Sequence, residues 1–163
     1  MNDLIPIATI GIGATVTLDL WSLVRRGLLS TPLPDYGLVG RWLAHMAVEG
    51  RFRHEKIAAA RPVQGERALG WTAHYLIGIA FAALVPAVFG RAWLETPTLA
   101  PALAFGIATV AAPFLLMQPG MGAGIAASRT PNPSAARIQS LATHAIFGAG
   151  LYGAACLSLF INR

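Results

Sequence analysis

Four long apolar stretches divide the chain, at residues 4–24, 68–89, 98–117 and 138–161. Each holds about 20 residues, the length of helix that crosses roughly 30 Å of lipid hydrocarbon. None shows the alternation of apolar and polar residues that a strand requires, and in lipid a helix satisfies its own backbone hydrogen bonds. The pattern therefore predicts an all-α membrane protein with four transmembrane helices in a single integral-membrane domain, residues 1–163.

A shorter amphipathic segment lies between the first two stretches. Over residues 38–47, apolar side chains recur at helical spacing on one face, while Arg41 and His45 lie on the other. This predicts a helix lying on the membrane surface, with Trp42 at the depth of the lipid headgroups and Arg41 near anionic lipids. The basic segment that follows, residues 50–67, is expected to be mobile.

The connection between the third and fourth stretches contains signals that end one helix and start another. Pro119 and Gly120 predict the end, because proline cannot donate the next backbone hydrogen bond and glycine accepts a left-handed turn. Asn132 and Pro133 predict the start of the next helix, since asparagine can cap free amides and proline suits the first helical position.

Several long strings in the chain are distinctive: ATVTLDLW, GRWLAHM, ERALGWTAHY and MQPGMGAGIAASRTPNP. On these strings the chain resembles a bacterial integral-membrane family catalogued only as a domain of unknown function. The resemblance covers nearly the whole chain and implies a four-helix inner-membrane protein. It implies no activity, substrate or catalytic residue, so the chemistry rests on the residues themselves.

The composition supports a bilayer as the solvent, because 55% of the residues are hydrophobic and only 12% are charged. The formal net charge of +5 does not indicate a nucleic-acid partner, since the basic residues do not alternate with aromatic residues along a surface. The single cysteine, Cys156, excludes an intrachain disulfide and is expected to be a small buried residue. The N-terminal segment lacks the basic start of a cleavable signal peptide, so we expect it to be retained.

The basic residues predict the orientation. Ten of the twelve lie in the two connections that precede the second and fourth stretches, and only Arg91 and Arg163 lie elsewhere. By the positive-inside rule, both connections face the cytoplasm and both termini face the periplasm of a bacterial inner membrane. Anionic lipids at the cytoplasmic face are the expected surface partners.

Three ionisable residues are predicted to share one depth. Asp19, His74 and His144 each lie six residues, or roughly 9 Å, from the cytoplasmic end of an apolar stretch. Each also belongs to a stripe of small residues, where membrane helices approach one another. We therefore expect the second and fourth helices to touch through Gly78 and Gly148, and the three side chains to form one intramembrane polar site open to the cytoplasm.

This site could serve metal binding or proton chemistry. Histidines near helix starts tend to be neutral, and two imidazoles with one carboxylate suit a divalent metal if further ligands complete the set. A haem held by both histidines is an alternative that nothing in the spacing selects. The carbonyl of Thr109, freed by Pro113, could add an acceptor. The site's further candidate contributors are Gln118, Arg129, Glu66 and Tyr75.

Each of these residues also has a purely structural explanation, because a histidine or aspartate can hydrogen-bond a neighbouring backbone and act only in packing. The glycine run 120–124, with Ser128, Arg129 and Thr130, could instead bind a phosphate through backbone amides and a guanidinium. Glycine-rich turns are common for geometric reasons, however, and no strand precedes this one, so it is not a nucleotide-binding motif.

Three function classes remain open. The first is a transporter or channel for a small solute or ion, as a homo-oligomer because four helices leave little room for a pathway. The second is a metal-binding membrane enzyme or redox protein that uses the same polar residues. The third is an accessory subunit of a larger membrane complex.

Overall fold

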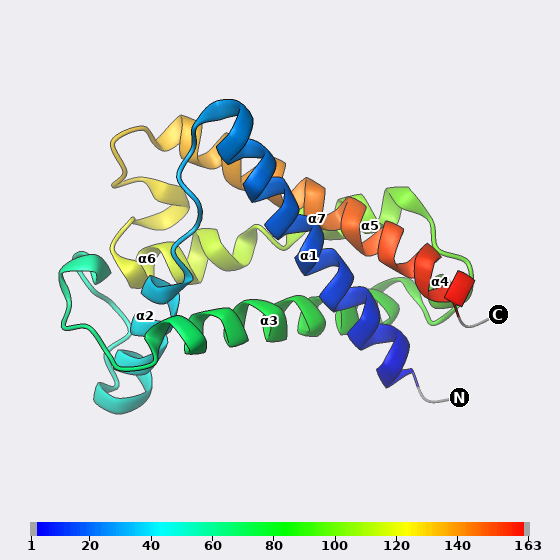
Figure 1. The fold of residues 1–163 in the computed structure, drawn as a ribbon, viewed down its shortest axis with the longest axis horizontal. Helices are drawn as coiled ribbons and strands as arrows, with labels where there is room; N and C mark the ends of the chain where they lie inside the picture. The colour runs from blue at the N-terminus through cyan, green and yellow to red at the C-terminus, as the bar shows by residue number, and fades with distance from the viewer. Residues whose placement is uncertain (1–2, 162–163) are drawn as a thin grey trace. The chain divides into compact units, whose positions relative to one another are not determined.

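The computed structural model describes residues 3–161 and is all-helical, with 78% helix and no strand in that range. Its helices are shown in Figure 1. Those long and apolar enough to span a membrane confirm the predicted fold class: α1 (Leu4–Leu29), α3 (Glu66–Phe89), the segment Leu99–Met121, which begins with α5 (Leu99–Ala108), and α7 (Pro133–Ile161). Residues 1–2 and 162–163, which include Arg163, lie outside the described residues. The predicted periplasmic location of the two termini refers to these residues and stays a prediction.

The other helical elements are short: α2 (Tyr36–Glu49), η1 (Ile57–Ala59), α4 (Ala92–Glu95), a π-helical turn η2 (Pro113–Met117), α6 (Gln118–Met121) and η3 (Ile125–Ala127). The predicted surface helix is α2, whose bounds extend two residues beyond 38–47 at each end. The chain contacts fall into two compact units, which are described separately. The first unit comprises residues 1–33, 75–109 and 141–163, and the second comprises residues 34–74 and 110–140.

All four spanning segments extend beyond their apolar stretches, and α1 and α7 extend the most. Helix α1 continues through Arg25 and Arg26 to Leu29. Helix α7 begins at Pro133, where the side chain of Asn132 accepts a hydrogen bond from the amide of Ala135 at 3.1 Å, as the sequence predicted. Polar and basic residues are good helix formers outside hydrocarbon, so hydropathy marks the lipid thickness and caps mark the helix.

The predicted helix stop at Pro119 and Gly120 is wrong by two residues. Both residues belong to α6, which ends at Met121, and Gly122 takes the left-handed conformation with φ of 98°. Pro119 is tolerated because the π-helical turn that precedes α6 already displaces the regular backbone hydrogen bonds.

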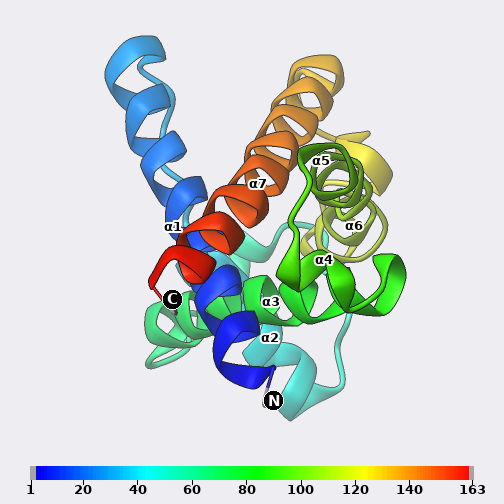
Figure 2. The same ribbon diagram turned by 90° about the vertical axis from the view of Figure 1, so that its right-hand side faces the viewer.

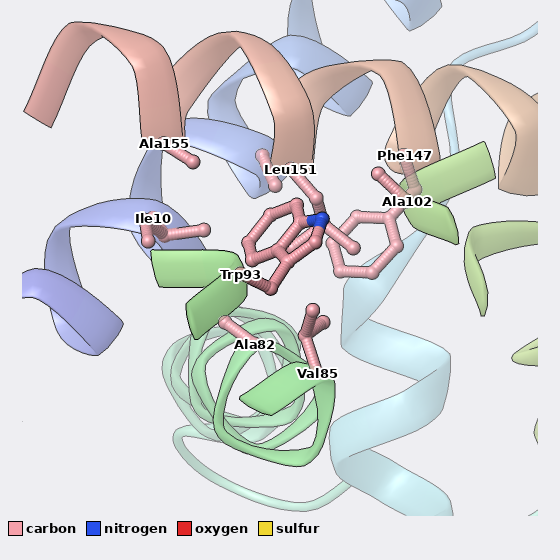
Figure 3. Close-up of a cluster of buried hydrophobic side chains, with 9 residues drawn as sticks. Ile10, Ala82, Val85, Trp93, Ala102, Phe147, Leu151 and Ala155 are labelled. Atoms are coloured by element: carbon pink, nitrogen blue, oxygen red, sulfur yellow. The ribbon is translucent and has the colours of Figure 1, made fainter. Parts of the chain in front are cut away.

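The core of the first unit surrounds one indole. Figure 3 shows Trp93 of α4 among side chains that include Ile10 of α1, Val85 of α3 and Leu151 of α7. Trp93 is 5% exposed, and its indole N–H donates to the carbonyl of Thr98 at 3.2 Å, so its only polar atom is satisfied. This cluster joins the spanning helices of the first unit.

Small residues set the helix pairs of the first unit, but not the pair that was predicted. A side chain at Gly78 would meet Thr15 and Gly11 of α1, and one at Gly148 would meet Ala102 and Leu103 of α5. The predicted Gly78–Gly148 contact is therefore wrong. Small-residue stripes identify the faces on which helices pack, but not their partners.

Helix α7 also contacts α3 and α1 in the first unit. Helices α3 and α7 touch through Phe81 and Phe147, whose ring centroids lie 6.1 Å apart. Figure 2 shows α1 and α7 crossing, and there a side chain at Gly150 would meet Ala14 and Thr17 of α1. Cys156 of α7 is exposed, contrary to the expectation of a buried residue, because it lies on the face of α7 away from these contacts.

The second unit is organised by a close approach of α2 to the start of α3. A side chain at Gly40 of α2 would overlap the carbonyl oxygen of Glu66, and one at Gly70 of α3 would overlap the carbonyl oxygen of Tyr36. The two backbones are therefore in direct contact, and only glycine fits at these positions.

Trp42 does not lie free at headgroup depth. It is 8% exposed, its indole donates to the carbonyl of Phe52 at 2.8 Å, and Gly120 packs against its ring. The backbone amide of His54 also donates to the carbonyl of Gly120 at 2.8 Å, and Ile57 is buried. The basic segment expected to be mobile is therefore ordered, and it packs on the glycine-rich connection.

Candidate functional site

Asp19, in the spanning helix α1, accepts a hydrogen bond from a tyrosine. The hydroxyl of Tyr75 in α3 donates to Oδ2 of Asp19 in α1 at 2.8 Å, and both side chains are half-buried. Both residues belong to the first unit. A carboxylate inside a candidate membrane span is costly unless it is hydrogen-bonded, so this contact stabilises Asp19 where it lies.

His144 is fixed in one tautomer by a threonine. The Thr109 hydroxyl donates its only proton to the carbonyl of Gly106, while its oxygen lies 2.8 Å from Nδ1 of His144. The oxygen must therefore accept from Nδ1–H, which leaves Nε2 of a neutral ring as a proton acceptor. A proton added at Nε2 would not disturb the contact with Thr109.

The predicted proximity of His144 to a helix start is wrong. Because α7 begins at Pro133, His144 lies eleven residues, or about three turns, into the helix. The helix dipole acts mainly within the first turn, so it does not explain a neutral His144. The hydrogen bond to Thr109 selects the tautomer instead.

His74 lies in the second unit, among aromatic rings. It stacks on Tyr36 with ring centroids 4.1 Å apart, and it meets Trp71 edge to face at 5.9 Å. Asp19 and His144 belong together to the first unit and bind different hydroxyl groups. A joint site of all three residues stays a prediction.

Glu66 has a structural partner. Its carboxylate accepts from Nε and NH2 of Arg41 at 2.8 and 2.7 Å and from the amide of Val63 at 2.9 Å. The hydrogen bond to Glu66 raises the pKa of Arg41 above its ordinary value. Arg41 also donates to the carbonyls of Ala58 and Ala60. The pair therefore joins α2, η1 and α3, and Arg41 is not free for lipid.

Both ring nitrogens of His45 face hydrogen-bond acceptors. Its Nδ1 lies 2.9 Å from Glu49 and its Nε2 lies 3.0 Å from the carbonyl of Arg61, and both partners can only accept. The carbonyl of Arg61 and then the carboxylate of Glu49 raise the pKa of His45 above its ordinary value. Its ring lies edge to face against His54, with centroids 5.3 Å apart.

The remaining predicted contributors lie near the glycine-rich connection. Gln118 is the first residue of α6, and its Oε1 is buried without a hydrogen-bond partner. Arg129 is exposed and lines a cavity of the second unit. Within residues 3–161, no group of three or more His, Cys, Asp or Glu side chains is placed to hold a metal ion. The metal-binding alternative, which needs further ligands, stays a prediction.

Sequence reasoning missed the side chain of Thr109. It considered only the carbonyl, whereas the hydroxyl binds His144. The signal was present, because Thr109 is the only residue with a polar side chain between Leu99 and Pro113. A lone hydroxyl in an apolar helix is a common partner for a polar group on a neighbouring helix.

No curated protein and no solved structure matches the chain. Residues 8–158 match a family described as "Protein of unknown function (DUF2938)". The match covers most of the chain, as the resemblance of its long strings implied. The chain therefore belongs to the DUF2938 family.

Proposed function

We propose that this protein carries protons, or a small solute together with protons, across the bacterial inner membrane. The observation that carries the proposal is the pair of ionisable side chains inside candidate membrane spans, Asp19 and His144, each bound to a hydroxyl group. Ionisable residues inside a membrane are costly and typically mark ion pathways and proton relays.

The two contacts suit reversible protonation. Asp19 can gain and lose a proton while Tyr75 continues to donate to one of its oxygens. His144 can take a proton at Nε2 while Nδ1 continues to donate to Thr109. Neither change requires either of these two hydrogen bonds to break, so protonation can cycle while both contacts remain.

Proton flux into proteoliposomes tests this proposal. With a pH-sensitive dye inside and an imposed membrane potential, we expect Asp19→Asn to reduce the flux of the purified protein roughly tenfold or more, as loss of an essential proton-transfer group typically does. Asparagine still accepts from Tyr75 but cannot ionise. His144→Gln should act similarly, because glutamine can donate to Thr109 but cannot take up a proton.

Asp3→Asn is the matched control. Asp3 precedes α1 and pairs with Arg91 at 2.7 Å outside the spans. The proton flux of the Asp3→Asn variant should therefore equal that of the parent. If Asp19→Asn and His144→Gln fold normally and also match the parent, proton transport is wrong. Packing and an accessory role in a larger complex would then be the better explanation of both residues.

We further propose that the second unit faces the cytoplasm. This unit contains eight of the twelve basic residues against four acidic ones, as the positive-inside rule requires of a cytoplasmic segment. After Cys156 is replaced by serine, a cysteine at exposed Arg53 should react with a membrane-impermeant maleimide only once the cells are permeabilised. Reaction in intact cells would reverse the orientation.

A further inference from the structure

Two basic segments far apart in the sequence line one open cavity in the second unit. The cavity, of about 370 Å³, is lined by Arg51 and Arg53 from the segment after α2 and by Arg129 from the glycine-rich connection. The two segments are joined where the His54 amide donates to the Gly120 carbonyl. A side chain at Gly122 would overlap the carbonyl of Glu55, so the approach is close.

The charge of the lining is unbalanced. Within residues 3–161, Arg51, Arg53 and Arg129 form no ion pair, and Glu55 is the only acidic residue at the cavity. Three guanidinium groups against one carboxylate leave an excess of about two positive charges. That excess matches a phosphate monoester, which carries roughly −1.5 to −2 at neutral pH.

The cavity also offers neutral hydrogen-bonding groups. Ser128, whose side chain carries a hydroxyl, is one of the lining residues. His54, which is 7% exposed, also lines it, and His54 Nε2 has no hydrogen-bond partner among the described residues. The His45 ring packs edge to face against the His54 ring and helps to hold it at the wall. Guanidinium, hydroxyl and imidazole groups together are the usual partners of a phosphate.

The backbone of the connection is held in an uncommon conformation at this cavity. Ala126 and Ala127 both have positive φ, 46° and 58°, which is unfavourable for residues with a Cβ. The conformation is held by Arg137, whose Nε donates to the carbonyl of Ala126 at 2.8 Å. It is also held by the amide of Arg129, which donates to the carbonyl of Ala123 at 2.8 Å. These bonds fix the backbone from which Ser128 and Arg129 reach the cavity.

We propose that this cavity binds the phosphate monoester group of a small ligand, through Arg51, Arg53, Arg129 and Ser128. The volume lies at the lower end of the range for small-molecule sites, so it accommodates the phosphate with a small attached group. The ligand is either a soluble phosphorylated molecule or the headgroup of a lipid with a terminal phosphate. The cavity lining includes neither Asp19 nor His144. The phosphate-binding proposal therefore does not depend on the proposal of proton transport.

Calorimetric titration of the full chain in detergent with glycerol 3-phosphate tests the soluble source. Titration of the full chain in nanodiscs of phosphatidylcholine with phosphatidic acid tests the lipid source, with phosphatidylglycerol as the diester comparison. We expect saturable binding in one of these arms and preference for the monoester. Arg53→Gln and Arg129→Gln should each weaken binding tenfold or more, because each removes charge-assisted hydrogen bonds.

Arg67→Gln is the matched control. Arg67 is exposed, belongs to the second unit and is not part of the cavity lining, so its removal changes the net charge equally and should leave the dissociation constant within twofold of the parent. Equal weakening by all three variants would reduce the effect to general electrostatics and overturn the site. Absence of saturable binding in both arms would also overturn it. Asp19→Asn should bind like the parent, which separates this result from the flux experiment.

Discussion

Gly40→Ala should lower the apparent Tm of the protein in detergent by about 10 °C and disrupt the second unit. The added methyl group would overlap the carbonyl oxygen of Glu66, which belongs to the backbone of α3 and cannot rotate away. Relief requires α2 and α3 to separate, which we expect to cost about 3 kcal/mol or more. Tryptophan fluorescence during heating measures the change.

The control for this substitution is Gly153→Ala in α7. A side chain at Gly153 would meet no atom within 4 Å, and alanine favours a helix over glycine, so this variant should be as stable as the parent or slightly more stable. If Gly40→Ala also unfolds at the parent's temperature, the close approach of α2 to α3 is wrong.

Arg41→Ala should lower the apparent Tm by about 5–8 °C, because it removes a bidentate ion pair and two hydrogen bonds to backbone carbonyls. The side chains of Arg41 and Glu66 are 11% and 20% exposed. Water can therefore replace only some of the hydrogen bonds that the Glu66 carboxylate loses when Arg41 is removed. Limited proteolysis should cut the segment around η1 faster, since Arg41 binds the carbonyls of Ala58 and Ala60 there.

Arg91→Ala provides the comparison for an exposed pair. Its guanidinium binds Asp3 at 2.7 Å, but the two side chains are 56% and 34% exposed, and exposed ion pairs contribute little. We expect a change within about 2 °C. An equal loss of stability in both arginine variants would show that Arg41 contributes only its charge.

Hydropathy and capping signals predicted the spanning helices well. Apolar length is a direct requirement of the bilayer, so each of the four stretches marks one of the spanning segments α1, α3, Leu99–Met121 and α7. The Asn132 cap was also predicted, because its mechanism is local. The same local signals placed the helix end at Pro119, two residues too early. The π-helical turn before α6 shifts the backbone hydrogen bonds, so proline is tolerated at that position.

Contacts between distant residues could not be predicted in the same way. The stripe of small residues that contains Gly78 correctly indicated a packing face, but it gave no information that α1 would be the partner. The arginines of the first connection and Arg129 were interpreted separately, as topology signals and as part of a glycine-rich turn. Their shared cavity depends on the contact of His54 with Gly120, across more than sixty residues.

The small buried share of the spanning helices has a consequence for how the protein is made. Only 17–33% of the most apolar window of each span is buried inside the chain, so a ribosome-released copy in water would expose most of its apolar surface. Its four segments must therefore enter the lipid during or directly after synthesis, before they pair. Lipid then removes the hydrophobic driving force between helices. Close packing must therefore decide which inserted segments remain together, through the contact of Gly78 with α1 and the contact of Gly148 with α5.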